Sequence, residues 1–262
     1  MGTAATTIAI LGAGTMGEAL LTGSLDGGLA AHDVWVTARS ARRVDDLVAT
    51  YGVHGTTDNA RAASGAGIVV LAVPPQNVTD LVAEVADHLG DGAVVVSLAD
   101  GISLADLEGL LPRGAAAARA MPSLTSRVGH GLTLLTTGDG CTEEQAEAIT
   151  AFLGRSGEVV RVEEDRQAAL GPLSSGGPAY FLYVADAMIE AGAVRGVPRD
   201  LARRLVARAM AGSAAWLQDS AEDAAALRAQ VTAPGGAGIR RIAELDRRAV
   251  RAAFVTALTR SV

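Results

Sequence analysis

The chain of 262 residues contains no lysine, and all 22 of its basic residues are arginines. Chemistry that needs a lysine amine is therefore excluded: a Schiff base with a carbonyl substrate, pyridoxal phosphate catalysis and the lysine-containing phosphate loop of many nucleotide-binding proteins. The net charge is −7, and the sequence has no basic tail and no arginine stripe interleaved with aromatic residues, so we expect no nucleic-acid partner.

Cysteine and long apolar runs are also scarce. The single Cys141 excludes an internal disulfide framework, and the four histidines are too far apart in sequence for a metal site, so no metal is expected. No apolar run approaches the ~20 residues of a membrane span. Residues 1–7 lack the basic region and apolar segment of a secretory signal. We therefore expect a cytoplasmic enzyme without a membrane partner.

The strongest positive signal is a glycine-rich turn near the N-terminus. Residues 8–11 form an apolar run typical of a buried strand, and Gly12, Gly14 and Gly17 follow with the spacing G-x-G-x-x-G at the start of a helical pattern. In nucleotide-binding proteins the first glycine permits a tight turn, the second admits a pyrophosphate and the third allows close helix packing. We therefore predict a dinucleotide site here.

The end of the second predicted strand, residues 33–38, indicates which dinucleotide. An acidic residue at this place holds the ribose 2′-hydroxyl of NAD, whereas arginine accommodates the 2′-phosphate of NADP. This strand is followed by Arg39 and Ser40, with Arg42 and Arg43 close behind. The alternative is that these arginines are only a solvated helix start. We predict NADPH as the cofactor, with Arg39 and Ser40 at its 2′-phosphate.

Strands and helices alternate over about the first 160 residues, which is typical of a doubly wound sheet. Further strands are expected near residue 53 and at residues 67–73, 94–97, 115–120, 132–136 and 158–162. Ser103 is expected to cap a helix over residues 104–111, and residues 121–126 to form a loop. After residue 163 only helical patterns follow, at residues 179–192, 199–219, 221–231, 237–245 and from 247 onwards.

These patterns predict an α/β protein of two domains. Residues 1–162 would form a Rossmann-type dinucleotide-binding domain, and residues 163–262 an all-helical domain. The apolar faces of the alanine-rich helices are extensive for a lone bundle, so we expect a homodimer or larger homo-oligomer. Two glycine-rich segments interrupt the helical part, at residues 173–180 and 231–238.

These two segments, together with residues 12–17, 71–76, 99–103 and 119–122, make the chain resemble pyrroline-5-carboxylate reductases. The likeness keeps the same order over nearly the whole length. It implies NADPH-dependent reduction of a cyclic imine, pyrroline-5-carboxylate to proline, in an intertwined homodimer or larger assembly. By the same resemblance, the active site would lie between the nicotinamide and helical segments of two subunits.

The resemblance also implies roles for individual residues. The cofactor would be bound by Gly12, Ala13, Gly14, Thr15, Met16, Arg39, Ser40, Val73, Pro74, Gln76, Met121, Pro122 and Ser123. The substrate would be bound by Ser175, Gly176, Gly177, Pro178, Pro234, Gly235, Gly236, Ala237 and Gly238, with backbone N–H groups of the second segment facing its carboxylate. The candidates for a catalytic hydroxyl are Ser175, Thr232 and Tyr180.

The chain also departs from the family pattern. Pro74 stands where the family usually has lysine, and residues 123–125 replace its usual Asn-Thr-Pro. Ala233 and Gly238 stand where the family has hydroxyl residues near the substrate. Two alternatives to the proline reaction therefore stay open: an imine reductase of a specialised biosynthetic pathway, and an NADP-binding sensor without activity. A β-hydroxyacid dehydrogenase is disfavoured, because those enzymes rely on a lysine near the reacting oxygen.

Overall fold

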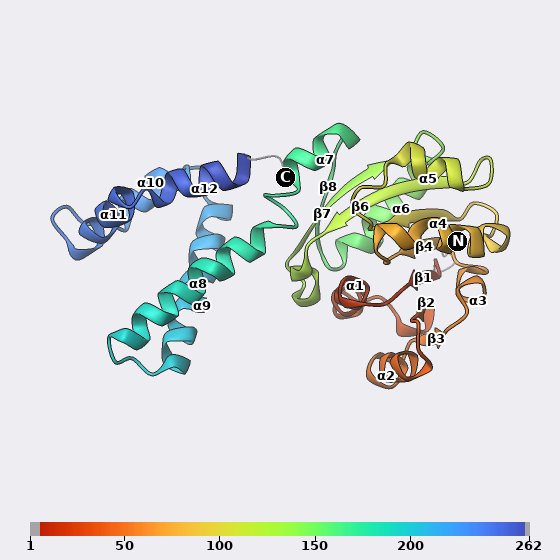
Figure 1. The fold of residues 1–262 in the computed structure, drawn as a ribbon, viewed down its shortest axis with the longest axis horizontal. Coiled ribbons are helices and arrows are strands. Elements are labelled where there is room, and N and C mark those ends of the chain that lie inside the picture. Colours follow the sequence, from red (N-terminus) through yellow and green to blue (C-terminus); the bar gives the residue numbers. More distant parts are fainter. Residues whose placement is uncertain (1–5, 260–262) are drawn as a thin grey trace. The chain divides into compact units, whose positions relative to one another are not determined.

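The computed structural model describes residues 6–259. The chain divides into two compact units, which we name the sheet unit, ending at Pro178, and the helical unit, beginning at Ala179 (Figure 1).

Within the described residues, the sheet unit contains a single sheet of eight strands in the order β3-β2-β1-β4-β5-β6-β7-β8. Neighbouring strands are parallel except β6 and β7, which are antiparallel. The strands are β1 (Ile8–Leu11), β2 (Val34–Thr37), β3 (His54–Thr56), β4 (Ile68–Leu71), β5 (Val94–Ser97), β6 (Ala116–Pro122), β7 (Gly131–Thr137) and β8 (Gly157–Arg161). The strand order reverses between β1 and β4, and in doubly wound sheets this is where ligands bind.

Helices cover both faces of this sheet. They are α1 (Thr15–Asp26), α2 (Ala41–Tyr51), α3 (Asn59–Ala63), α4 (Val78–Val85), α5 (Leu104–Leu110), α6 (Glu143–Gly154) and α7 (Glu164–Leu170). Short 3₁₀ helices are η1 (Ala31–Asp33), η2 (Pro75–Asn77), η3 (Ala86–His88) and η4 (Leu124–Val128).

The alternation of side chains along the strands explains the two covered faces. Ile8 and Ile10 of β1 belong to a core cluster with residues of α1, α2 and α6. Ala9 and Leu11 belong to a second cluster, with residues of α3, α4 and α5. Because successive side chains of a strand point to opposite faces, a continuous apolar run marks a strand that is buried on both sides. The predicted doubly wound α/β fold is confirmed.

Most predicted elements are present, some with shifted ends. Strand β5 has the predicted bounds, and Ser103 caps α5 as expected, with its Oγ accepting a hydrogen bond from the Asp106 N–H at 3.0 Å. The expected loop at residues 121–126 is wrong at its start, because Met121 and Pro122 end β6 and pair with Leu134 and Thr133 of β7. Its remainder enters η4.

Helix α7 has no counterpart in the predicted elements, and side-chain hydrogen bonds join it to β6, to β7 and to the start of α5. Glu164 Oε1 accepts hydrogen bonds from Arg119 Nη1 of β6 at 2.6 Å and from the backbone N–H of Leu104 at 2.7 Å. Gln167 Nε2 donates to Thr136 Oγ1 of β7 at 2.8 Å. The compact sheet unit therefore includes α7 and ends at Pro178, whereas the sequence predicts a domain boundary after residue 162.

The helical unit has little core of its own. Its helices are α8 (Gly177–Val194), which begins at the end of the sheet unit, α9 (Arg199–Asp219), α10 (Ala224–Gln230), α11 (Ala237–Arg247) and α12 (Val250–Thr259). Of the large hydrophobic side chains that are exposed in residues 6–259, fourteen of eighteen belong to this unit, and its only buried hydrophobic residues there are Ala185, Ala202, Val206 and Leu227. Among the helices described, none is both long and apolar enough to cross a membrane.

We predict that Glu164→Ala lowers the free energy of unfolding by about 2–3 kcal/mol, because the Arg119 charge, 11% exposed, would lose its partner. The matched control is Glu143→Ala, which breaks the more exposed pair with Arg161 and should cost below ~1 kcal/mol. Urea unfolding followed by circular dichroism, at one protein concentration, measures both. Equal losses in the two variants would contradict a structural role for Glu164.

Candidate functional site

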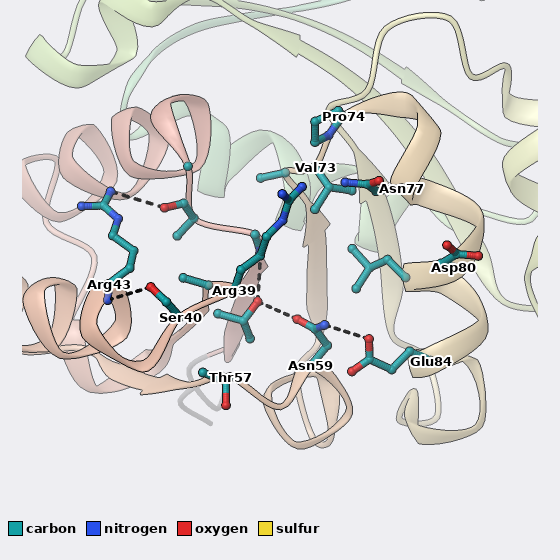
Figure 2. A pocket seen from close by; sticks show the side chains of 17 residues that line it. Arg39, Ser40, Arg43, Thr57, Asn59, Val73, Pro74, Asn77, Asp80 and Glu84 are labelled. Carbon is teal, nitrogen blue, oxygen red and sulfur yellow. Dashed lines mark hydrogen bonds between the residues drawn. The ribbon is translucent and has the colours of Figure 1, made fainter.

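A cavity of about 680 Å³ lies beyond the carboxyl ends of β1, β2 and β4 (Figure 2). This is the edge at which the strand order reverses, so the cavity occupies the place where open α/β sheets bind ligands. Its walls come from the turns after these strands and from α4. They are formed by Gly12, Ala13, Gly14, Thr37, Ala38, Arg39, Ser40, Arg43, Thr57, Asn59, Ala72, Val73, Pro74, Asn77, Asp80, Leu81 and Glu84.

The glycine turn has the geometry predicted for it. Gly12 has a φ of +82°, and a side chain there would collide with Val73. A Cβ on Gly17 would lie 3.1 Å from the Ala72 Cβ, so α1 packs closely on the end of β4. The space above Gly14 is open, since the nearest atom to a Cβ there would be 3.9 Å away. The backbone can therefore be approached by a ligand at Gly14.

Helix α1 begins directly after Gly14. This N-cap residue has no side chain to accept hydrogen bonds from the first turn, and within the described residues no other side chain caps it. The N–H groups of a first helical turn have no partners inside the helix and carry a partial positive charge. The turn therefore presents an anion-binding helix N-terminus to the cavity.

A chain of side-chain hydrogen bonds supports the glycine turn from below. Thr37 Oγ1, on a residue that is 1% exposed, accepts from the Gly12 N–H at 2.9 Å and donates to Asn59 Oδ1 at 2.7 Å. Asn59 Nδ2 donates in turn to Glu84 Oε2 at 2.8 Å (Figure 2). The network joins the turn to β2, α3 and α4. Sequence reasoning missed these three residues; a threonine ending an apolar strand was the available signal.

The end of β2 supplies the cationic corner of the cavity. Figure 2 shows Arg39 extending from the strand end towards Val73, and in the described part of the chain it forms no ion pair. Ser40 is the N-cap of α2, where its Oγ accepts from the Arg43 N–H at 3.3 Å. Of the two arginines that line the cavity, Arg43 instead pairs with Glu18 at 2.7 Å. Arg39 is thus available for an anion.

Glu18 is held as a carboxylate. Burial alone raises its pKa, whereas hydrogen bonds from Arg43 and Tyr51 lower it. The charges of Arg43 and Arg127 add to the lowering, and the pKa of Glu18 lies below its ordinary value. Its negative charge is present at neutral pH and neutralises Arg43.

Several predicted cofactor residues do not line this cavity. They are Thr15, Met16, Gln76, Met121, Pro122 and Ser123. Ser123 is almost fully buried, and its Oγ accepts from the Leu132 N–H at 3.0 Å and lies 2.7 Å from Thr125 Oγ1. That hydroxyl is engaged within the β6–β7 hairpin.

Met121 connects the predicted cofactor and substrate segments. A Cβ on Gly171 would lie 3.1 Å from Met121 Sδ, so the turn after α7 packs on this methionine. The chain then folds back over Gly171, whose carbonyl accepts from the Gly176 N–H at 3.1 Å and from Ser175 Oγ at 3.3 Å. The structure thus brings Met121 beside the predicted substrate segment that begins at Ser175.

The remaining predicted substrate residues belong to the helical unit. Gly236 is the N-cap of α11 and donates its own N–H to the Ala233 carbonyl at 2.9 Å. Gly235 has a φ of +71° and accepts from Arg240 Nη1 at 2.6 Å. Because Gly236 has no side chain, the first-turn N–H groups of α11 have no cap from it. Pro234, Ala237 and Gly238 complete this segment.

The three candidate catalytic hydroxyls differ in whether they already donate a hydrogen bond. Thr232 Oγ1 donates to the Arg228 carbonyl at 2.9 Å, and Ser175 donates to Gly171. The Tyr180 hydroxyl, on α8, has no hydrogen-bond partner in the described structure. Tyr180 is therefore the candidate whose donor is not already committed.

Three features define a dinucleotide-binding protein of the NADP-dependent oxidoreductase class. They are the doubly wound sheet, the glycine turn at a helix N-terminus, and an arginine at the end of β2 that forms no ion pair within residues 6–259. Comparison with known families agrees. Residues 7–101 match the family described as NADP oxidoreductase, coenzyme F420-dependent, and residues 164–262 match the family of pyrroline-5-carboxylate reductase dimerisation.

Individual relatives cover nearly the whole chain. The pyrroline-5-carboxylate reductase of Corynebacterium melassecola is 35% identical over 255 residues, 96% of this chain and 94% of that protein. The enzyme of Mycobacterium leprae is 38% identical over 266 residues, 93% of this chain and 90% of that protein. The chain belongs to the pyrroline-5-carboxylate reductase family, as its motifs predicted.

Solved structures agree with this assignment. A pyrroline-5-carboxylate reductase of Coxiella burnetii has a TM-score of 0.87 and 30% identity, covering 97% of this chain and 95% of that one. The pyrroline carboxylate reductase of Plasmodium falciparum, solved with NADP bound, has a TM-score of 0.88, with coverage of 98% and 95%. At 19% identity, this second likeness concerns the fold alone.

Proposed function

We propose that this chain is an NADPH-dependent reductase that converts the C=N bond of a small cyclic imine to an amine, with pyrroline-5-carboxylate, reduced to proline, as its substrate. The observation that carries the proposal is the cavity at the edge of the sheet, where the anion-binding turn and Arg39 lie together. The chain's membership of the reductase family supports it. We also propose a cytoplasmic location. With one cysteine, the chain has no internal disulfide that would require an oxidising compartment.

The residues of the cavity fit a phosphorylated dinucleotide. The open space over Gly14 and the N-terminus of α1 would receive the pyrophosphate. Arg39 and the N-terminus of α2, which begins after Ser40, would receive the 2′-phosphate. NADPH, when bound, supplies the hydride that reduces the imine carbon. The protein's part is to orient the two reactants and to exclude water.

We propose that backbone N–H groups at the start of α11 bind the carboxylate of the substrate. Ala237 and Gly238 lie in its first turn, where N–H groups have no partner inside the helix. A carboxylate at a helix N-terminus is stabilised without a basic side chain. An imine that arrives protonated needs little acid catalysis, and Tyr180 is the donor that we assign to the nitrogen if a proton is required.

The alternative is an NADP-binding sensor without turnover. Ala233 and Gly238 favour it, because hydroxyl side chains that the family places near the substrate are missing. Both proposals require nucleotide binding, and turnover of an imine distinguishes them.

We further propose that the chain functions as a homodimer or larger homo-oligomer joined through residues 163–262. Support comes from the dimerisation family matched over residues 164–262 and from the exposed apolar side chains of the helical unit. Burying such side chains contributes most of the free energy of a permanent interface.

Cofactor choice gives the first prediction here. Wild type should bind NADPH more tightly than NADH, and Arg39→Ala should weaken NADPH about ten- to a hundredfold with little change for NADH, because a charge-assisted bond to the 2′-phosphate is lost. Calorimetric titration with both nucleotides measures this. The control is Arg42→Ala, a neighbouring exposed arginine that does not line the cavity. Equal dissociation constants for the two nucleotides in wild type would overturn the assignment.

Oligomerisation gives the second prediction. Light scattering at micromolar concentration should report at least a dimer, and Leu205→Glu, which places a charge on an exposed apolar position of α9, should lower the mass. Val48→Glu, at an exposed apolar position of the sheet unit, should leave the mass unchanged. A monomeric wild type with full activity would remove the proposed interface.

Substrate choice gives the third prediction. A Cβ on Gly238 would lie 3.7 Å from Thr232 Cγ2, an ordinary contact, so a Cβ is tolerated at this position. Gly238→Thr should raise the catalytic efficiency with pyrroline-5-carboxylate by about ten- to a hundredfold, because a donor to a charged group is restored. Gly238→Val fills the same space without a hydroxyl and should bring no gain.

The assay follows NADPH oxidation with pyrroline-5-carboxylate beside larger five- and six-membered cyclic imines. Ordinary efficiency of wild type, with no gain in Gly238→Thr, would show that the missing hydroxyls do not limit the reaction. Preference of wild type for a larger imine would assign the chain to a specialised pathway. NADPH binding without reduction of any imine would support the sensor.

A further inference from the structure

A carboxylate outside the cavity organises the two helices on which the cofactor depends. Glu18 lies in the first turn of α1 and does not line the cavity. Its Oε2 accepts from Arg43 Nη2 of α2 at 2.7 Å, and its Oε1 accepts from the Tyr51 hydroxyl, also of α2, at 2.9 Å. Arg127 of η4 lies 3.8 Å from the same carboxylate. One side chain of α1 thus holds both ends of α2.

Arg43 connects this cluster to the cavity wall. The same Nη2 lies 3.4 Å from the carbonyl oxygen of Ala13, inside the glycine turn, and donates to it. The backbone N–H of Arg43 donates to Ser40 Oγ at the N-cap of α2. Figure 2 shows the Arg43 side chain directed to the glycine turn and away from Arg39. The residue therefore joins the start of α2 to the start of α1.

We propose that Glu18 and Arg43 are positioning residues that set the separation between the two phosphate sites of the cofactor and thereby determine the preference for NADPH. This inference rests on the proposed function. The pyrophosphate site belongs to α1 and the 2′-phosphate site to α2, so a ligand that uses both is sensitive to how these helices pack. NADH has no 2′-phosphate and uses only the site on α1.

The same pair decides which arginine meets the 2′-phosphate. Because Glu18 neutralises the Arg43 guanidinium and holds it at the turn, Arg39 provides the uncompensated charge. The competing arrangement is that Arg43 is itself a phosphate ligand which Glu18 restrains. The two arrangements predict opposite effects when the carboxylate is removed.

The test is the affinity of Glu18→Gln for NADPH and NADH. The amide keeps the shape of the side chain but removes its charge, so α2 is held less firmly. We expect NADPH to bind about five- to tenfold more weakly, with less than about a twofold change for NADH. Tyr51→Phe, which removes one hydrogen bond from the same carboxylate, should shift the preference in the same direction by a smaller factor. It serves as the second variant if Glu18→Gln does not fold.

The matched control is Glu143→Gln, which alters another glutamate–arginine pair, with Arg161, away from the cavity. It should leave both affinities unchanged. Arg39→Ala in the Glu18→Gln background should still lower NADPH affinity further, since Arg39 remains the phosphate ligand. Thermal unfolding of every variant separates a change in preference from a general loss of structure.

Four outcomes overturn the inference. Tighter NADPH binding by Glu18→Gln would show that Arg43 is a restrained phosphate ligand. Equal weakening of both nucleotides would show that Glu18 supports only the glycine turn. Unchanged affinities would show that the pair has no positioning role. A wild type that binds NADH but has no preference for NADPH would remove the proposed cofactor and this inference with it.

Discussion

Gly12 turns the chain with a φ of +82° directly beneath the Val73 side chain, and a residue with a Cβ does not fit there. The contact lies where the neighbouring strands β1 and β4 end and where the chain turns from β1 into α1. The close approach of Gly17 to Ala72 continues it along the helix. Because Gly12, Ala13, Ala72 and Val73 all line the cavity, its anion-binding turn depends on a backbone conformation that only glycine permits at position 12.

Local sequence signals predicted the strands and helices whose residue pattern is complete within the segment itself. The apolar run of β5 and the long pattern of α9 were predicted with their observed bounds. The end of β6 was not, because Met121 and Pro122 are extended only through pairing with β7, a contact that leaves no local pattern. Helix α7 was not predicted for the same reason, because its polar residues Glu164 and Gln167 form their hydrogen bonds with residues of other elements.

Some residues of the candidate site could likewise be predicted from the sequence, and others could not. The glycine turn and Arg39 could be predicted because each is a short motif whose chemistry follows from its position after a strand. Thr37, Asn59 and Glu84 could not, because each is ordinary in sequence and acquires its role through hydrogen bonds between separate elements. The substrate residues were proposed through the family resemblance, and the structure distributes them over the sheet unit and the helical unit.

A chain without lysine can carry out this chemistry because binding and reaction make different demands. In the proposed site, anions would meet backbone N–H groups at helix N-termini and one arginine, so no amine is needed for recognition. Reduction of a protonated imine develops no alkoxide and needs no strong acid beside the acceptor. The protein's contribution is then mainly orientation, which depends on how firmly the phosphate sites are spaced. The partly buried carboxylate of Glu18, which joins the two helices that would carry these sites, therefore influences orientation although it does not line the cavity.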